Sequence, residues 1–350
     1  MKKLIIFLLV STLLLFVCFT VNAESYKFRV AYTDPLRLQI GDEKLIHVTV
    51  AAVYAFEDNI NRSTGGAFKV EFKHSGVLGG QIETIDQTQE GIIEATTPAI
   101  DALAGYFPNL QVLSIPYLFD NPAIAWEVWD SEVGQELFEQ MAQETDLRII
   151  TIFDNGGYRN FSNNVRPIKK PVDMKGIKIR TMESPSPMKM VESLGGSPTP
   201  VAWTELYTSL QTGVVDGEEN SPATILAGSL QEVQKYYTID QHTLSTAVIV
   251  VSEKWFQSLP DDVKNKVKVA GKVASVAGRG AAYTNNKLAM ELLSEKMEIY
   301  HPTSEGRAAF KEIAQPAVLE WMRNNDKIDN QWIDKILKAT EEAGKKLGLK

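Results

Sequence analysis

Short apolar runs alternate with longer amphipathic stretches along most of the chain. The short runs are rich in β-branched and aromatic residues, as strands are, and the longer ones repeat their apolar positions with a helical period. We predict, in chain order, strand 26–32, helix 46–61, strand 68–72, helix 81–90, strand 92–97, helices within 123–144 and strand 148–153. Strands that alternate with helices favour an α/β architecture over a β-sandwich or a helical bundle.

The second half repeats this order with clearer start and stop signals. Ser184-Pro185 is typical of a helix start, and Gly195-Gly196 is typical of a helix end. We predict strand 176–180, a helix between these two signals, strand 198–201, helix 204–211 and strand 214–216. Both halves are therefore predicted to be built from βαβ units.

One late helical pattern is unusually long, running from Pro260 to about Tyr300 and interrupted only by glycines at 271, 278 and 280. A continuous helix of about 40 residues would be about 60 Å long, which exceeds the diameter of one domain. Such a helix either breaks at the glycines or bridges two lobes. The lysine-rich end, 335–350, is typical of a solvated final helix.

The N-terminal segment has the pattern of a secretory signal peptide. Lys2 and Lys3 precede an apolar run over 4–20, and the small-residue site 21–23 follows it. We expect cleavage after Ala23, which would export the mature protein to the periplasm and remove the only cysteine, Cys18. An uncleaved membrane anchor is the alternative. Lipidation of Cys18 is disfavoured because large residues precede that cysteine.

Composition and charge narrow the function classes. A chain of 350 residues with 44% hydrophobic residues is long enough for two globular domains. Its formal net charge is −8 at pH 7, so nucleic acid or an anionic membrane would need a local basic patch. We predict no nucleic-acid partner.

The sequence carries no motif of a common catalytic or metal site. It has no G-x-S-x-G, H-E-x-x-H, Walker or G-x-G-x-x-G pattern, and no pair of its four histidines has metal-ligand spacing. The acids Asp216, Glu218 and Glu219 can be interpreted as a glycosidase pair or as a solvated loop, and we favour the loop. We predict no catalytic residue, metal or cofactor.

Arg180 is the candidate that position alone singles out. It ends a predicted strand, and ligands of open α/β sheets bind beyond the carboxyl ends of strands. A guanidinium there can hold a carboxylate through two hydrogen bonds. The alternatives are a surface arginine paired with a nearby acid and, for Trp203 at the end of the next strand, ordinary core packing.

Two internal runs are similar to a known family. Residues 164–180 read NVRPIKKPVDMKGIKIR, and residues 203–220 read WTELYTSLQTGVVDGEEN. These runs, with Gly65-Gly66, LGG at 78–80, IPYLF at 115–119 and the long late helix, resemble the extracytoplasmic solute receptors of TRAP transporters, the DctP-like family. The resemblance covers most of the mature chain.

The resemblance implies a two-lobed periplasmic binding protein fold with hinge strands and a long helix that spans both lobes. Lobe I would contain 24–155 and about 246–285, and lobe II 156–245 and about 286–350. Such a receptor closes on a small organic acid and delivers it to a TRAP membrane permease driven by an ion gradient. Arg180 would pair with the ligand carboxylate, and we expect contacts across the cleft from the loops after Tyr32, Leu78 and Thr96.

Other ligand-binding candidates follow from the same resemblance. Arg159 matches a second arginine that some members use, and Trp203 matches an aromatic wall. The positions that match polar pocket linings are Glu183, Glu219, Asn220 and His242. Gln81 and Thr97 are candidates from strand ends and helix starts, with structural roles equally open.

Two departures and two alternatives remain. Many members read DGQENP where this chain has DGEENSP at 216–222, which can shift Asn220, and the loop 33–37 lacks a family consensus. A periplasmic enzyme that uses the acids at 216–219, or a sensor that presents its ligand to a membrane kinase, is the rival function. Uronates, dicarboxylates, keto acids and aromatic acids are all open as ligands.

Overall fold

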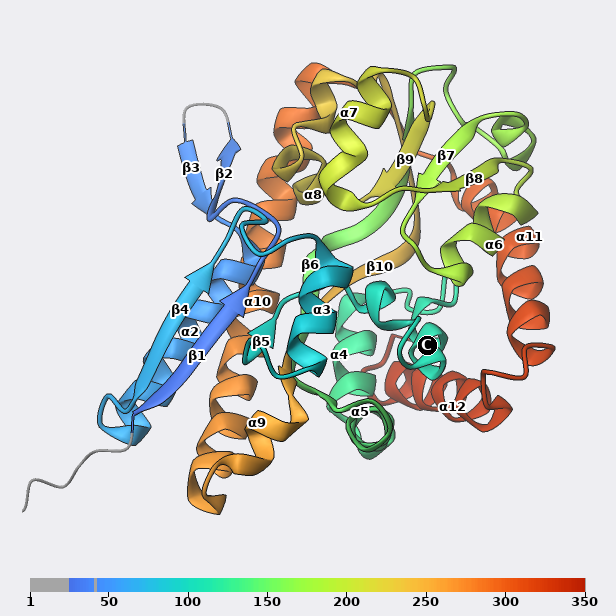
Figure 1. The fold of residues 1–350 in the computed structure, drawn as a ribbon. Coiled ribbons are helices and arrows are strands. Elements are labelled where there is room, and N and C mark those ends of the chain that lie inside the picture. Colours follow the sequence, from blue (N-terminus) through green and yellow to red (C-terminus); the bar gives the residue numbers. More distant parts are fainter. Residues whose placement is uncertain (1–24, 41–42, 350) are drawn as a thin grey trace, which may run out of the picture.

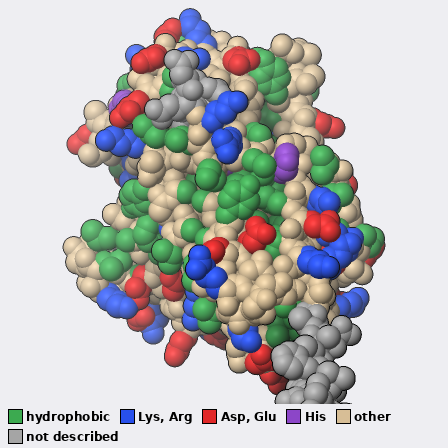
Figure 2. All heavy atoms as spheres, turned by 90° about the vertical axis from the view of Figure 1, so that its left-hand side faces the viewer, with side chains coloured by type: hydrophobic (Ala, Val, Ile, Leu, Met, Phe, Trp, Pro, Cys, Tyr) green, Lys and Arg blue, Asp and Glu red, His purple; other side chains and the backbone are tan. Residues whose placement is uncertain are grey.

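The computed structural model describes residues 25–40 and 43–349 (Figure 1). The predicted signal peptide, with Cys18, lies outside these residues. Within the described ranges, no helix combines the length and the apolar content needed to cross a membrane. Figure 2 shows basic and acidic side chains interspersed on the face at the left of Figure 1, so the net negative charge is not concentrated there.

Two long antiparallel strands form the centre of the fold. They are β6 (Leu147–Asn163) and β10 (Tyr236–Ser252), which pair from Leu147↔Ser252 to Asn163↔Tyr236. Their pairing has register shifts, one of them between Thr238 and Thr243. Because both strands continue from one end of the sheet to the other, they connect its two halves.

The remaining strands divide between the two ends of one nine-stranded sheet, in the order β4-β1-β5-β10-β6-β9-β7-β8, with β11 beside β10. We call β4, β1 and β5 the β1 half, and β9, β7 and β8 the β7 half. Strand pairing is parallel within each half and antiparallel where a half meets β6 or β10. The bounds are β1 (Tyr26–Ala31), β4 (Phe68–Lys73), β5 (Ala95–Thr96), β7 (Lys178–Thr181), β8 (Ser197–Pro200), β9 (Gly217–Asn220) and β11 (Glu298–Tyr300); β2 (Arg37–Ile40) and β3 (Glu43–Ile46) form a separate hairpin.

The long helix α10 (Asp261–Lys296) is continuous, so the predicted pattern does not break at its glycines. At 36 residues it is about 54 Å long. A Cβ atom on Gly271 would lie 2.1 Å from the carbonyl oxygen of Ile150, and one on Gly278 would lie 2.7 Å from the Phe153 ring. These two glycines therefore let α10 pack directly on β6.

The other helices begin and end at recognisable signals. Asn121 and Ser131 cap α4 and α5 with their side chains, and Gly65 ends α2 in the left-handed conformation. The helix bounds are α2 (Val48–Thr64), α3 (Gln81–Gln89), α4 (Pro122–Asp130), α5 (Glu132–Thr145), α6 (Pro185–Ser193), α7 (Leu206–Gln211), α8 (Pro222–Ala227), α9 (Glu253–Ser258), α11 (Ser304–Arg323) and α12 (Asn330–Lys346). Short 3-10 helices are η1 (Ile100–Leu103), η2 (Pro108–Ser114), η3 (Pro171–Met174), η4 (Trp203–Glu205) and η5 (Leu230–Glu232).

The hydrophobic core has three parts. One packs β1, α2 and the first part of α10 around Phe28 and Phe56, and another packs α7, α8 and the end of α10 around Leu206 and Leu293. The largest surrounds Trp129 and includes residues of α4, α5, α11 and α12. Helix α11 contacts α6 of the β7 half, whereas α12 contacts α4 and α5.

Most predicted elements are present. The helices predicted within 123–144 are two, because Ser131 ends one and begins the next. The predicted strand 92–97 is shorter than expected, since only Ala95–Thr96 pair as β5. The predicted strand 148–153 is the first part of the much longer β6, and the predicted strand 214–216 is displaced to β9 at 217–220. Gly156-Gly157 lies inside β6 and has the local pattern of a strand end, so the continuation of the strand beyond it is not visible in the local sequence.

Candidate functional site

Arg180 is a buried guanidinium that forms no ion pair with any acid in the described part of the chain. It lies on β7, where pairing with β8 places it opposite Thr199, and 3% of the residue is exposed. Its Nε donates to the carbonyl oxygen of Val201 at 2.8 Å. Among the described residues, no carboxylate lies within 4.0 Å of its nitrogens. Burial, together with the nearby charge of Arg159, lowers the pKa of Arg180 to about 10. A buried cation in this state favours an incoming anion.

Arg159, from β6, has an acidic partner inside the protein. Its Nη2 donates to Glu219 Oε1 at 2.7 Å, and its Nε contacts the other carboxylate oxygen. Burial alone would raise the pKa of Glu219, but the Arg159 charge and the His242 contact outweigh it and lower that pKa to about 2. The pair is therefore ionised, and most of the Arg159 charge is neutralised locally.

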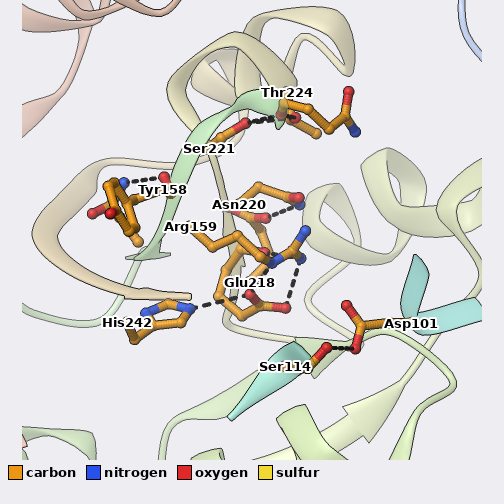
Figure 3. A network of polar contacts seen from close by, with 12 residues as sticks. Asp101, Ser114, Tyr158, Arg159, Glu218, Asn220, Ser221, Thr224 and His242 are labelled. Carbon is orange, nitrogen blue, oxygen red and sulfur yellow. Dashed lines mark hydrogen bonds and ion pairs between the residues drawn. The ribbon is translucent and has the colours of Figure 1, made fainter. Parts of the chain in front are cut away.

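His242 and Asp240 extend this pair into a row of alternating charges. His242 Nε2 lies 3.2 Å from Glu219 Oε2, and its Nδ1 lies 2.9 Å from Asp240 Oδ2. Burial opposes protonation, yet the two carboxylates raise the pKa of His242 to about 9. The Tyr117 hydroxyl donates to Asp240 at 2.9 Å. Figure 3 shows Arg159, Glu218 and His242 gathered beside β6.

Glu218 is buried on the opposite side of β9 from Glu219, since neighbouring residues of a strand alternate. Ser162 Oγ lies 2.5 Å from Glu218 Oε1 and 3.0 Å from Gln234 Oε1. One hydroxyl hydrogen cannot serve both acceptors, so the arrangement fits a protonated Glu218 that donates to Ser162. Burial and the Glu219 charge raise the pKa of Glu218 to about 7.

These contacts correct one expectation. The acids at 218 and 219 do not form a solvated loop: they lie in β9, where β6 pairs with them and polar side chains satisfy them. Because their side chains point to opposite sides of the strand, they also do not form two carboxylates flanking one bond.

Trp203 links the two halves of the sheet. Its indole Nε1 donates to Asp34 Oδ1 at 2.5 Å, and Asp34 lies in the loop after β1. Trp203 is half-buried and belongs to η4, which follows β8. Burial raises the pKa of Asp34 to about 6. The contact therefore joins the β1 half to the β7 half, in the region where the sequence predicts contacts after Tyr32.

Three of the four remaining candidates have hydrogen-bond partners within the protein. Asn220 Nδ2 donates to Glu218 Oε2 at 2.5 Å, and Glu183 is exposed before α6. Gln81 Oε1 accepts from the Ala99 amide, and the Thr97 hydroxyl donates to the Ala31 carbonyl oxygen. The structure thus brings Arg159, Arg180, Glu218, Glu219, Asn220 and His242 together, with Trp203 at the link to the β1 half.

Several residues of this region were not predicted. Asp101 accepts from the Ser114 hydroxyl at 2.6 Å, and both line a small cavity with Arg159 and Glu219. Asp240 and Ser162 have central roles in the polar network. The spacing of Asp240 and His242, two residues apart on a strand, was a usable signal because it places both side chains on one face. Within the described ranges, no group of three or more His, Cys, Asp or Glu side chains is arranged to hold a metal ion.

Comparison with known proteins gives consistent similarities. The profile of the family "Bacterial extracellular solute-binding protein, family 7" (DctP) matches residues 43–325. A solute-binding protein of Verminephrobacter eiseniae is 32% identical over 225 residues, which is 64% of this chain and 66%, just under two thirds, of that relative.

Two solved structures are similar over most of the chain. The sugar acid binding protein DctPAm from Advenella mimigardefordensis, in complex with galactonate, has a TM-score of 0.82 and 28% identity, covering 91% of this chain and 99% of that one. A TRAP periplasmic solute binding protein from Sulfitobacter sp. NAS-14.1 with bound β-D-galacturonate has a TM-score of 0.80 and 28% identity, covering 89% and 99%. These similarities confirm the predicted two-lobed α/β fold.

Proposed function

The chain belongs to family 7 of the bacterial extracellular solute-binding proteins, the DctP family, and from this membership we propose that it captures a small organic acid and delivers it to a TRAP permease. Members of this family are extracytoplasmic receptors and not enzymes. The finer location in the periplasm, reached through a signal peptide cleaved after Ala23, is part of the proposal.

The observation that carries the proposal is the unpaired charge of Arg180. A carboxylate that forms two hydrogen bonds with this guanidinium contributes about 1.5 to 3 kcal/mol net. It also relieves the cost of keeping a cation in a buried site. Arg180 is therefore the proposed ligand for the substrate carboxylate.

We propose a sugar acid with one carboxylate as the ligand class. The similar structures carry galactonate and β-D-galacturonate. Arg159 is engaged by Glu219, so a second guest carboxylate would have to compete with an internal one. This arrangement weighs against dicarboxylates. Keto acids and aromatic acids are the other outcomes of the test below.

The other candidate residues have supporting roles in this proposal. Arg159, Glu219 and His242 hold one another in place and present a polar wall. Asn220 offers its amide beside that wall, Trp203 supplies an aromatic wall for the sugar ring, and Glu183 lies exposed before α6. We assign no ligand contact to Gln81 or Thr97 because both already have backbone partners.

Closure around the ligand would use β6 and β10 as the hinge. The Trp203 to Asp34 hydrogen bond joins the two halves of the sheet, and a ligand stabilises closure when it contacts both halves. We keep the predicted lobes, 24–155 with 246–285 and 156–245 with 286–350, as a proposal. The contacts of α12 with α4 and α5 would transfer 330–346 to the first lobe.

A screen of organic acids by thermal shift tests the proposal. Galactonate, galacturonate, succinate, pyruvate and benzoate are added to the chain without residues 1–23, and hits are measured by calorimetry. We expect a sugar acid to bind without being converted. Turnover of the ligand would favour a periplasmic enzyme. Binding with no permease gene beside this one would favour a sensor that presents the ligand to a membrane kinase.

A further inference from the structure

A second cavity lies against the hinge strands, with a volume of about 400 Å³. Its lining includes Asp154, Gly157 and Tyr158 of β6, Gln241 of β10, and Tyr283 and Asn286 of α10. Tyr158 and Arg159 are neighbours on β6, so their side chains point to opposite sides of the strand (Figure 3). The cavity is therefore separate from the Arg159 and Arg180 region, and its volume is in the range of small-molecule sites.

The backbone of both hinge strands is irregular beside this cavity. Gly156 and Gly157 have φ of +85° and +95°, and Gln241 has φ of +56°. A Cβ atom on Gly157 would lie 2.9 Å from Asn286 Oδ1. The missing side chain at Gly157 thus leaves room between β6 and α10.

The cavity contains a buried carboxylate with few donors. Asp154 is 2% exposed, and both its oxygens lie 3.0 Å from a single donor, the Nε1 of Trp126. The nearby guanidinium of Arg279 pairs instead with Asp130 at 2.6 Å. Among the described residues, no cation lies within 4.0 Å of Asp154. Burial raises the pKa of Asp154 to about 7. A carboxylate can accept about four hydrogen bonds, so this one has unused capacity.

Two further features of the lining fit a cation. Asn286 Oδ1 is buried and has no hydrogen-bond partner in the part of the chain that the structure describes. The rings of Tyr158 and Tyr283 and the thioether of Met290 form the less polar part of the wall. Acceptor oxygens next to aromatic rings are the chemistry that recognises ammonium groups.

We propose that this cavity binds a small organic cation, with its ammonium group against Asp154 and its apolar groups against Tyr158, Tyr283 and Met290. The proposal is independent of the organic-acid site, because it uses other residues on the other side of β6. A neutral hydroxylated compound of the same shape is the alternative occupant.

Choline and its neutral isostere 3,3-dimethyl-1-butanol distinguish the two occupants. Binding of each to the chain without residues 1–23 is measured by ligand-observed NMR and calorimetry. We expect choline to bind at least about tenfold more tightly than the isostere, since only choline has the charge that Asp154 and the rings attract. Equal affinities of the two compounds, or no choline binding at about 100 mM, would overturn the proposal.

Variants locate the site. Asp154→Asn and Tyr283→Ala should each weaken choline binding at least about fivefold. Each change should weaken binding of the isostere less than it weakens binding of choline. Tyr283 is exposed, so its replacement should not disturb the core. Circular dichroism checks that each variant folds. If Asp154→Asn does not fold, the test uses Tyr283→Ala alone. Unchanged choline affinity in the folded variants would reject this cavity as its site.

Discussion

The Arg159 guanidinium contacts both carboxylate oxygens of Glu219, and the ion pair is buried between β6 and β9. Arg180 lies near this pair but has no acidic partner among the described residues. Of these two neighbouring arginines, Arg159 is thus neutralised by an internal carboxylate, and Arg180 is left for a ligand.

Glu219→Gln should destabilise the protein strongly. Removal of one partner from a buried ion pair leaves the other charge uncompensated, which costs about 3 to 5 kcal/mol. Glu218→Gln is the matched control, since an amide replaces a carboxyl that is largely protonated at pH 6, and its change should stay within about 1 kcal/mol. Urea unfolding at pH 6 measures both variants, and equal losses would contradict the assigned charges.

Stability should fall as the pH rises through neutrality. The pKa of Glu218 is about 7 in the folded protein, above its ordinary 4.5, so the folded state holds this proton more tightly. The raised pKa of Glu218 therefore contributes fully to the free energy of unfolding below pH 4.5, and this contribution is lost as the pH rises through 7. Asp154, with a pKa of about 7, and His242, with a pKa of about 9, act in the same direction.

Glu218→Gln isolates the first of these groups. The midpoint of thermal unfolding, measured from about pH 6.5 to about pH 8.5, should fall less steeply for the variant than for the wild type. This range lies above the one in which His47, whose pKa burial lowers to about 3, opposes the trend. Some slope should remain because Asp154 and His242 still titrate. Identical slopes would mean that Glu218 does not hold the proton.

Trp203→Phe should weaken ligand binding without unfolding the protein. The change keeps an aromatic ring but removes the Nε1 donor to Asp34, and a hydrogen bond of this kind contributes about 1 kcal/mol. Tyr207→Phe is the control, since it removes a hydrogen bond to Glu232 at the surface of the same region. Calorimetry with the sugar acid found in the screen should show a severalfold loss only for Trp203→Phe. If Trp203→Phe bound the sugar acid as tightly as the wild type, the hydrogen bond to Asp34 would have no role in closure around the ligand.

Gly157→Ala should be destabilising, because alanine at φ of +95° is strained and its Cβ would meet Asn286. We expect a loss of at least about 1 kcal/mol. Gly280→Ala in α10 is the contrasting change, since a Cβ there meets open space and alanine favours the helix by up to about 1 kcal/mol. Urea unfolding should therefore give opposite signs for the two variants. The same sign for both would contradict the hinge conformation.

The sequence predicts those features that local patterns determine. The order of strands and helices, the glycine at the end of α2 and the strand-end position of Arg180 all depend on neighbours in the chain. The burial of Glu218 and Glu219 does not, because it depends on Arg159 and Ser162, which lie more than fifty residues away. A run of two acids before an asparagine looks solvated until its distant partners are known.

The long strands β6 and β10 also could not be predicted from local patterns. Neither the length of β6 and β10 nor their pairing follows from a local period, since the partners are about 75 to 105 residues apart. From the sequence, the glycines of α10 were compatible with a helix that breaks and with one continuous helix that bridges two lobes. The continuity of α10 excludes a break at the glycines, and the close approach of Gly271 to Ile150 explains that glycine by packing.

The most direct test of the organic-acid site is the affinity of Arg180→Ala and Arg180→Lys for the sugar acid that binds the wild type. Arg62→Ala, at an exposed ion pair of α2, is the control. We predict that both Arg180 variants lose at least about a hundredfold in affinity, that Arg62→Ala loses none, and that the empty variants unfold near the wild-type temperature. Wild-type affinity in Arg180→Ala would contradict the account.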